Sequence, residues 1–478
     1  MMQNDWAGAE FRGATSLDVR VRGNLADLCQ RLAADPTSAF SAAAGSSGRQ
    51  VFQRLSSGSG KRSPGDVADT WDQDPESGIA AVELLSGHVK ETARRCQAYP
   101  LVLVAQDTTE LYFPHSPIPM QRGGLGPTSV EPNKRGLFAH AALALSPAGL
   151  PLGVLHIEFW SRDPTEHGKR VTRRSRATVA KESQKWLSGV QAIEAALPAE
   201  QPVLVVQDRE GDVFALLAQS RRPNTWLLIR ACQNRKVKCV TAEGKTVTDH
   251  LFHVAKAGTV LGELTVQAPR QRDQEEETIR LELQASQMDV QPPINLPAAE
   301  RRRLGTATVW VIRAREINPP PGNPAIEWVL VTTLPVRTAA EAAQIVGYYA
   351  CRWRIERLHY VLKSGMQVEA SQHASRATLE RVLGLYYLTS WWLLRLTYLG
   401  RLTPELPVQG ILTGAEIRIL VHSRRKPVNT IADAVMAIGI LGGYLPYRRA
   451  LPPGVKVLWR GYQRLEAAVL GYHARGKA

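Results

Sequence analysis

The sequence has few cysteines and no CxxC pair. Five cysteines in 478 residues are too few for a disulfide framework, and their odd number favours a reducing compartment. The missing CxxC pair argues against a cysteine-built zinc site. His140, His156 and His359 lie singly in apolar patterns, where a hydrogen-bonded core histidine is more common than a metal ligand. A zinc centre is therefore not expected.

The sequence also lacks an uninterrupted apolar run. Its opening residues, MMQNDWAGAEFRG, carry charges where a signal peptide needs apolar residues. The stretch 382–399 approaches the roughly 20 apolar residues that cross a bilayer, but Thr389, Ser390 and Arg395 interrupt it. A central arginine costs several kcal/mol in lipid. We therefore expect a buried helix here and a soluble, intracellular protein with no membrane partner.

An excess of positive charge is the main feature of the composition. Lys and Arg number 59 against 44 Asp and Glu, which gives a net charge of +15 and a pI near 9.8. A polyanion is the expected partner, nucleic acid first and an anionic membrane surface second. Hydrophobic residues at 44% and charged residues at 22% are ordinary for folded proteins. At about 100–200 residues per domain, the length predicts two to four domains.

The patterning predicts a helical beginning, a mixed middle and a helical end. Residues 5–35 have helical spacing, whereas residues 45–78 are rich in Ser and Gly and indicate a loose segment. Helical patterns resume at 339–399 and after residue 404, and no internal repeat is present. The expected strands of the middle are 101–105, 140–145, 152–159 and 202–206, followed by a β-rich stretch at 226–336.

A basic run at 162–185 is predicted to be a polar helix. It carries Lys169, Arg170, Arg173, Arg174 and Arg176. Such a run is as often a plain solvated face as a binding surface.

Two apolar strands each end in an aspartate. Residues 101–105 continue into Gln106 and Asp107, and residues 202–206 continue into Gln207 and Asp208. In open α/β sheets, ligands bind at the carboxyl ends of strands. Two carboxylates on adjacent strands repel each other and favour a divalent cation between them. Each aspartate alone is better explained as the cap of the turn or helix that follows it.

A third carboxylate lies in a helical pattern among cations. Tyr349, Arg352, Glu356 and Lys363 are spaced i, i+3, i+7 and i+14. At about 100° per residue, they form a stripe about 60° wide on one helix face. The stripe suits a salt-bridged surface, because Arg352 and Glu356 are an i,i+4 pair. It equally suits a metal ligand beside bound phosphates.

The three blocks together resemble the IS4-type DDE transposases. They are QDTTEL at 106–111, QDREGDVF at 207–214 and YYACRWRIERLHYVLKSG at 348–365. The signature of that family, Tyr-x2-Arg-x3-Glu-x6-Lys, is present in full in the third block. Further similar stretches lie at 156–162, 317–320, 326–333, 441–443 and 458–461, so the likeness extends from about residue 5 to residue 472.

The resemblance implies an α/β protein with an RNase H-like catalytic core. The core would span residues 79–400 and contain a β-rich insertion at about 226–336. A helical N-terminal domain, residues 1–78, would read the transposon end. A helical C-terminal domain, residues 401–478, would form a homodimer, with 450–472 as the candidate interface or, alternatively, as a helix packed on its own chain.

The resemblance also assigns the site. Asp107, Asp208 and Glu356 would hold two Mg²⁺ ions, for which Mn²⁺ can substitute. Two ions about 3.5–4 Å apart can activate the attacking oxygen and stabilise the leaving oxygen of a phosphodiester. Oxygen ligands suit either ion.

Five further residues would contact DNA. Tyr349, Arg352 and Lys363 match the family's grip on phosphates around the scissile bond, and Arg230 matches a phosphate contact. Trp328 matches a tryptophan that stacks on a base moved out of the duplex, although a strand tryptophan is otherwise read as core. Arg209, Glu210 and Asp212 are expected only to support the site.

The implied activity is cut-and-paste DNA transposition through a hairpin intermediate. Its partners would be double-stranded DNA with transposon inverted ends, target DNA and a second copy of the chain, in the cytoplasm of a prokaryote and associated with the nucleoid. A catalytically silent or poorly targeted DNA-binding protein derived from a transposase is the alternative. A structure-specific nuclease that cuts without joining is a third reading.

Overall fold

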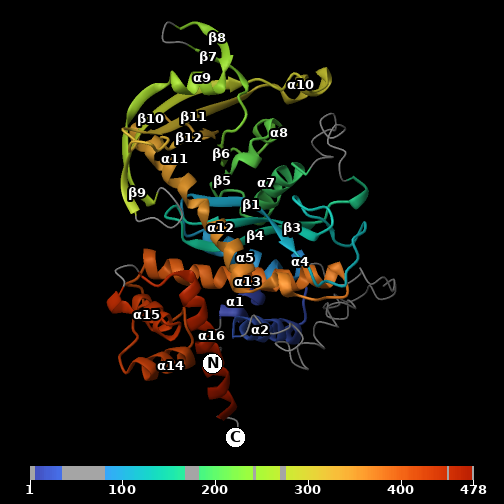
Figure 1. Ribbon diagram of the computed structural model, residues 1–478, viewed down its shortest axis with the longest axis vertical. Helices are drawn as coiled ribbons and strands as arrows, with labels where there is room; N and C mark the ends of the chain where they lie inside the picture. Colours follow the sequence, from blue (N-terminus) through green and yellow to red (C-terminus); the bar gives the residue numbers. More distant parts are fainter. Residues whose placement is uncertain are drawn as a thin grey trace.

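The computed structural model describes residues 6–34, 81–166, 182–240, 244–269, 276–448 and 452–475. The predicted loose segment at 45–78 lies outside the described residues. So does most of the predicted basic helix at 162–185, including Lys169, Arg170, Arg173, Arg174 and Arg176. The described parts fold as an α/β protein around one large mixed sheet (Figure 1).

Twelve strands of the described residues form the sheet. They run in the order β2-β3-β1-β5-β6-β12-β11-β10-β7-β8, with β4 paired to β3 and β9 paired to β10. The bounds are β1 Val102–Tyr112, β2 Gly126–Pro127, β3 Arg135–Leu145, β4 Pro151–Trp160, β5 Val203–Gln207, β6 Thr225–Arg230, β7 Lys236–Val240, β8 Thr246–His250, β9 Thr259–Pro269, β10 Glu276–Val290, β11 Ala307–Glu316 and β12 Glu327–Thr332.

The helices lie on both sides of the sheet and in a layer below it. Those before the middle of the chain are α1 Trp6–Arg12, α2 Val19–Ala34, α4 Ala81–Leu84, α5 Ser86–Cys96, α7 Gln184–Ala196, α8 Phe214–Ala218, α9 Leu251–Lys256 and α10 Ala298–Leu304. The later ones are α11 Ala339–Cys351, α12 Trp353–Tyr360, α13 Arg376–Leu402, α14 Gly414–Arg424, α15 Ile431–Leu441 and α16 Val455–Arg475.

The four predicted strands are present, and β1 is longer than predicted. Its residues 102–106 are buried on both faces, as an apolar run predicts. Beyond Gln106 the strand contains both buried and partly exposed residues, and the polar segment Asp-Thr-Thr-Glu is still part of it. Antiparallel pairing with β3 continues as far as Tyr112 opposite Gly136. Backbone hydrogen bonds to β3 thus extend the strand beyond its apolar residues. Composition alone does not reveal this pairing.

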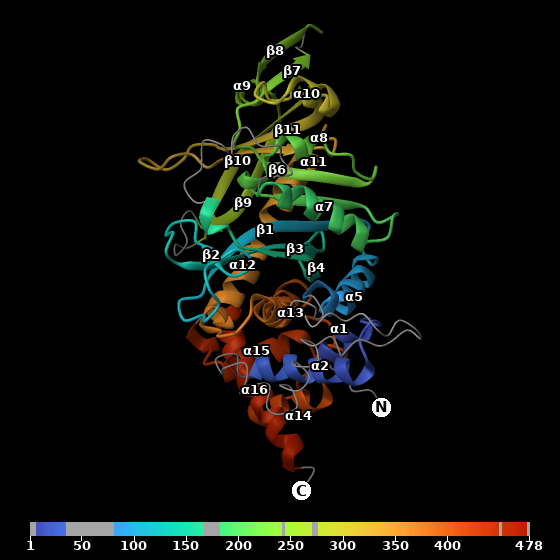
Figure 2. The same cartoon turned by 90° about the vertical axis from the view of Figure 1, so that its right-hand side faces the viewer.

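Helix α13 is the apolar stretch that the sequence marks as a buried helix. Nearly all residues from Leu379 to Leu399 are buried. The helix lies between the sheet and the helices of both chain ends, α1 and α2 on one side and α14 to α16 on the other (Figures 1 and 2). Among the described residues, none of the helices has the length and apolarity that a bilayer span requires.

Helix α16 packs largely on its own chain. Tyr462 and Leu465 are fully buried against α2, α13, α14 and α15, and the phenol of Tyr462 donates to the Glu416 carboxylate at 3.3 Å. For these two residues the alternative expectation holds, namely that the segment 450–472 packs on its own chain. Leu470 and Tyr472, near the end of the helix where it projects from the body, are 45% and 48% exposed (Figure 2).

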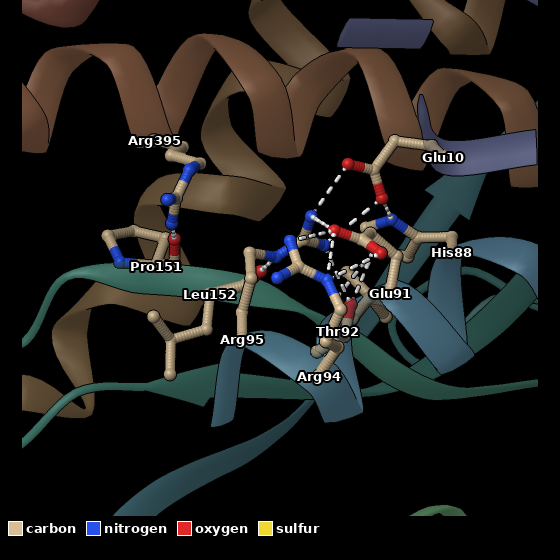
Figure 3. A network of polar contacts seen from close by, with 10 residues as sticks. Glu10, His88, Glu91, Thr92, Arg94, Arg95, Pro151, Leu152 and Arg395 are labelled. Atoms are coloured by element: carbon tan, nitrogen blue, oxygen red, sulfur yellow. Dashed lines mark hydrogen bonds and ion pairs between the residues drawn. The ribbon is translucent and has the colours of Figure 1, made fainter. Parts of the chain in front are cut away.

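A buried polar network joins α1 to α5 and β4 (Figure 3). The Glu10 carboxylate accepts from Arg95 at 2.8 and 3.0 Å and from the Nδ1 of His88 at 2.6 Å. The backbone N–H of Val154 donates to Nε2 of the same histidine at 2.8 Å. Because Nε2 accepts, Nδ1 carries the proton and His88 is neutral. Arg95 also covers the Trp391 ring at 4.7 Å.

The charge of Glu10 is therefore balanced by Arg95. Burial alone would raise the pKa of Glu10, but its contacts with His88 and Arg95 outweigh burial and lower the pKa to about 2. A carboxyl with a lowered pKa stabilises the fold above its unfolded pKa, and this contribution is lost as the pH falls toward 2. The network thus holds the N-terminal helices to the body at neutral pH.

Replacement of Glu10 by alanine tests this network. The variant leaves Arg95, whose side chain is 13% exposed, with only its 3.7 Å pair to Glu91, so we expect the free energy of unfolding to fall by about 3 kcal/mol. Urea denaturation followed by tryptophan fluorescence measures the change. The control is Glu131→Ala, which removes only an exposed pair with Lys134 and should leave the unfolding curve nearly unchanged. Equal effects of the two substitutions would contradict this assignment.

Candidate active site

Parallel pairing of β1 with β5 places two aspartates side by side. Leu103 is level with Leu204 and Ala105 is level with Val206. Asp107 comes two residues after Ala105, and Asp208 comes two residues after Val206. The two aspartates are therefore level with each other on neighbouring segments of the sheet. Adjacent strands are about 4.8 Å apart. Burial, followed by the charge of Asp107, raises the pKa of Asp208, which shows that the two carboxylates interact.

Asp208 also caps the turn that follows β5. Its Oδ1 accepts from the backbone N–H of Glu210 at 2.8 Å and so begins the 3₁₀ helix Arg209–Gly211. The capping explanation is therefore correct for one oxygen of this carboxylate. Its second oxygen is not used by the cap. Capping fixes the side chain in one orientation, which also prepares it for a ligand.

The third acid lies on a helix that is less regular than its sequence predicts. Tyr349 lies in the last turn of α11, Glu356 lies in α12, and Lys363 lies in a π-helical turn, Val361–Gly365. The prediction of one continuous α-helical stripe is wrong, because the chain changes its hydrogen-bonding pattern at Arg352 and again after Tyr360. Single π-turns in helices often occur at functional sites. Helix α12 packs on β1, the strand that carries Asp107.

Arg352 joins the carboxylates. Its Nη2 forms an ion pair with Glu356, and its Nη1 lies 3.9 Å from Oδ1 of Asp107. Its charge also lowers the pKa of Asp208 against the opposing effect of burial. The side chain is 6% exposed, yet within the described residues its Nε and Nη1 have no hydrogen-bond partner. The guanidinium is therefore held by charge and retains donors for a further anion.

A cluster of two rings and a second cation lies beside Arg352. The guanidinium carbon of Arg352 is 5.9 Å from the Tyr349 ring centre, and the Trp328 ring meets the Tyr349 ring edge-on at 5.4 Å. Burial raises the pKa of Tyr349, while Arg352 and Arg230 act to lower it. Arg230 ends β6, next to the Asp208 strand, and burial lowers its pKa.

Four of the five predicted DNA contacts are thus brought together next to the acids. Trp328 is partly buried on β12 and packs against the core. The alternative prediction of a strand-core tryptophan is therefore correct only in part. Lys363 is partly exposed in the π-turn, further along the chain from Glu356. Asp212 serves the scaffold, because it accepts from the backbone of Cys232 and Gln233 and pairs with Arg235.

His359 is a neighbour of the site that the sequence interpretation missed. Its Nδ1 lies 3.3 Å from Oδ2 of Asp107, and its ring meets Tyr387 edge-on at 6.1 Å. The expectation of a buried core histidine is correct for its burial but omits this contact. The available signal was its position three residues after Glu356, which places both on one face of α12.

The three carboxylates suit a hard divalent cation by their chemistry. Their oxygens are the ligands that Mg²⁺ and Mn²⁺ prefer, and the pKa of Asp208 is raised first by burial and then by the charge of Asp107. Within the described residues, however, no group of three His, Cys, Asp or Glu side chains is already gathered as a metal cluster. Arg352 stands between Asp107 and Glu356 and supplies the positive charge there.

Comparison with known families supports this chemistry. Residues 175–392 match the family model of the transposase DDE domain. The matched range contains Asp208 and Glu356, and Asp107 precedes it. The match supports a DDE transposase, and with it an enzyme that binds and acts on DNA.

Removal of the Arg352 charge tests the electrostatics of the site. In Arg352→Gln, Asp208 loses the charge that opposes the effect of burial on its pKa, so the folded-state pKa of Asp208 rises further. Acids with raised pKa values cost stability once the pH exceeds their unfolded pKa. We expect the variant to be less stable than the parent by about 2–3 kcal/mol at pH 7.5 and by much less at pH 4.5.

Urea denaturation at the two pH values measures this difference. Arg354→Gln is the matched control, because Arg354 lies on the same helix but covers the Tyr398 ring at 4.4 Å. Its stability cost should not depend on pH. A cost for Arg352→Gln that is equal at both pH values would show that the acids do not interact through it.

Proposed function

We propose that this protein is an IS4-type DDE transposase, similar to the Tn5 transposase, which excises its element and joins it to target DNA. The observation that carries the proposal is the position of Arg352, which pairs with Glu356 and lies 3.9 Å from Asp107, on the strand that pairs with the one preceding Asp208. The strand order that delivers them supports an RNase H-like core, with the β-rich insertion at about 226–336 between the second and third acids. The match to the transposase DDE domain supports the same class.

The acids would hold two Mg²⁺ ions, with Mn²⁺ as a substitute. Bound there, the ions would supply the Lewis acidity that a phosphodiester needs for attack and for departure of its 3′ oxygen. Asp208 is fixed by its cap, and Asp107 is held beside it by strand pairing and the His359 contact. Glu356 is carried to them on α12, within reach of the same cations.

The cationic side of the site would hold the DNA backbone. Among the described residues, Nε and Nη1 of Arg352 have no hydrogen-bond partner, and Nη1 is held by charge 3.9 Å from Asp107. Arg230 and the Tyr349 phenol interact beside this guanidinium. Guanidinium groups suit phosphate because their donors match two oxygens at once. Lys363 would add a charge further along the strand. Trp328, partly exposed beside Tyr349, would stack on the base that a hairpin requires to leave the duplex.

The proposed sequence of events is cleavage at the inverted ends, hairpin formation and opening, and strand transfer. Residues 1–78 would recognise the ends and residues 401–478 would support a homodimer, since two ends must be processed together. The protein would act in the prokaryotic cytoplasm at the nucleoid. A nuclease on the same core would cut and never join, and a silent DNA-binding derivative would do neither.

Substitution of the acids tests the catalytic assignment. Asp107→Ala, Asp208→Ala and Glu356→Ala should each reduce Mg²⁺-dependent cleavage of a duplex bearing the flanking inverted end to background, because each removes a ligand. Gel-based cleavage assays measure the loss. Asp289→Asn, a strand acid that accepts from Thr308 far from the site, should cut normally. Full activity of any of the three alanine variants would remove that residue from the site.

Joining requires its own assay. Precut ends supplied with target plasmid should be transferred by the parent chain. Cleavage without transfer would favour the nuclease, and end binding without either reaction would favour the silent derivative.

The exposed end of α16 is the remaining candidate dimer surface. Leu470→Glu should convert the DNA-bound dimer to a monomer, because it puts a charge into an apolar contact. Light scattering with and without end DNA measures the mass. Val19→Glu, at a 64% exposed position of α2, is the control and should leave assembly intact. A Leu470→Glu protein that still pairs two ends would exclude this surface.

A further inference from the structure

Each of the two aspartates is preceded by a glutamine, and neither glutamine has a role in the proposed chemistry. Gln106 and Gln207 are both fully buried, whereas Asp107 and Asp208 are partly exposed. Successive residues of a strand point to opposite faces. On β1, Gln106 therefore lies on the face opposite to Asp107, away from α12.

The two glutamine side chains are hydrogen-bonded to each other. The Nε2 of Gln207 donates to the Oε1 of Gln106. Their residues are level in the parallel pairing, because Ala105 is opposite Val206. The bond therefore ties β1 to β5 one residue before each aspartate, on the far side of the sheet from the acids.

Two glycines enclose this bridge. A Cβ added to Gly189 of α7 would lie 2.1 Å from Nε2 of Gln106. A Cβ added to Gly211, in the 3₁₀ helix that Asp208 caps, would lie 2.6 Å from Oε1 of Gln207. The backbone at each glycine therefore packs closely against one of the two amides, which a larger residue at either position would displace.

Stability alone does not account for the pair. Within the described residues, Nε2 of Gln106 and Oε1 of Gln207 have no partner although they are buried. Each such group costs about 1–3 kcal/mol, and two apolar side chains of the same size would avoid the cost. The glutamine bridge is therefore expensive, and it lies directly behind two carboxylates that repel each other. This combination points to a role in keeping the two carboxylates in position.

We propose that Gln106 and Gln207 are positioning residues for the active site. Their bridge fixes the ends of β1 and β5 against the repulsion between Asp107 and Asp208, so that both carboxylates meet one divalent cation. The inference rests on the proposed function, and it adds a second layer behind the acids. Contacts behind metal ligands commonly change metal affinity or activity by 10–100-fold.

Methionine variants of the full-length chain test the bridge. Gln106→Met and Gln207→Met keep the length of the side chain and remove its amide. Electron paramagnetic resonance of free Mn²⁺ measures the affinity of each protein for Mn²⁺ alone. We expect about 10–100-fold weaker binding, and a matching rise in the Mg²⁺ concentration needed for half-maximal cleavage. Affinity for end DNA should stay at the parent value.

The double variant and a matched control separate positioning from general destabilisation. Because the two amides act as one bridge, the double variant should bind Mn²⁺ no more weakly than either single variant. Gln201→Met removes a buried glutamine that donates to the carbonyls of Tyr99 and Pro202 just before β5. It should lower thermal stability and leave Mn²⁺ affinity unchanged.

The outcomes are distinct. Parent-like Mn²⁺ affinity in the Gln106 and Gln207 variants, additive losses in the double variant, or an equal loss in Gln201→Met would each overturn the positioning role while the proposed function stands. A parent chain that neither binds Mn²⁺ nor cleaves end DNA would overturn the proposed function and this inference with it.

Discussion

The structure depends on how repulsion between carboxylates at adjacent strand ends is balanced. Asp107 and Asp208 are level because β1 and β5 pair in parallel, and their closeness raises the pKa of Asp208. Arg352 supplies the compensating charge from a helix that the chain reaches only after the β-rich strands. Because water is partly excluded, an unpaired carboxylate or guanidinium here would carry a large desolvation cost. Each charge therefore requires the opposite charge or a ligand beside it.

This balance gives the site two sides with different chemistry. On one side are hard oxygens that suit a divalent cation. On the other are Arg352, Arg230 and the ring of Tyr349, which suit phosphate and its sugar-base neighbours. The proposed substrate, a phosphodiester with a metal-assisted leaving group, would use both at once. The polar network around Glu10 holds the N-terminal helices to the same body.

Much of this could be predicted from sequence because it depends on local patterns. Apolar runs before Asp107 and Asp208 identified the two strands that carry or precede these acids, although β1 continues past Asp107 to Tyr112, and the spacing of Arg352 and Glu356 identified the third element. What could not be predicted depends on contacts between distant segments. The His359–Asp107 contact, the Gln106–Gln207 bridge and the π-turn at Lys363 follow from packing. For the same reason, the amphipathic pattern of α16 could not tell an interface from a face packed on its own chain.

The central claim is that Asp107, Asp208 and Glu356 converge on shared cations. Anomalous X-ray diffraction from crystals soaked in Mn²⁺ tests it most directly. The account predicts manganese peaks bounded by these three carboxylates, with the Arg352 guanidinium displaced from at least one of them. Manganese bound elsewhere, with the three acids still occupied only by Arg352 and His359, would contradict it.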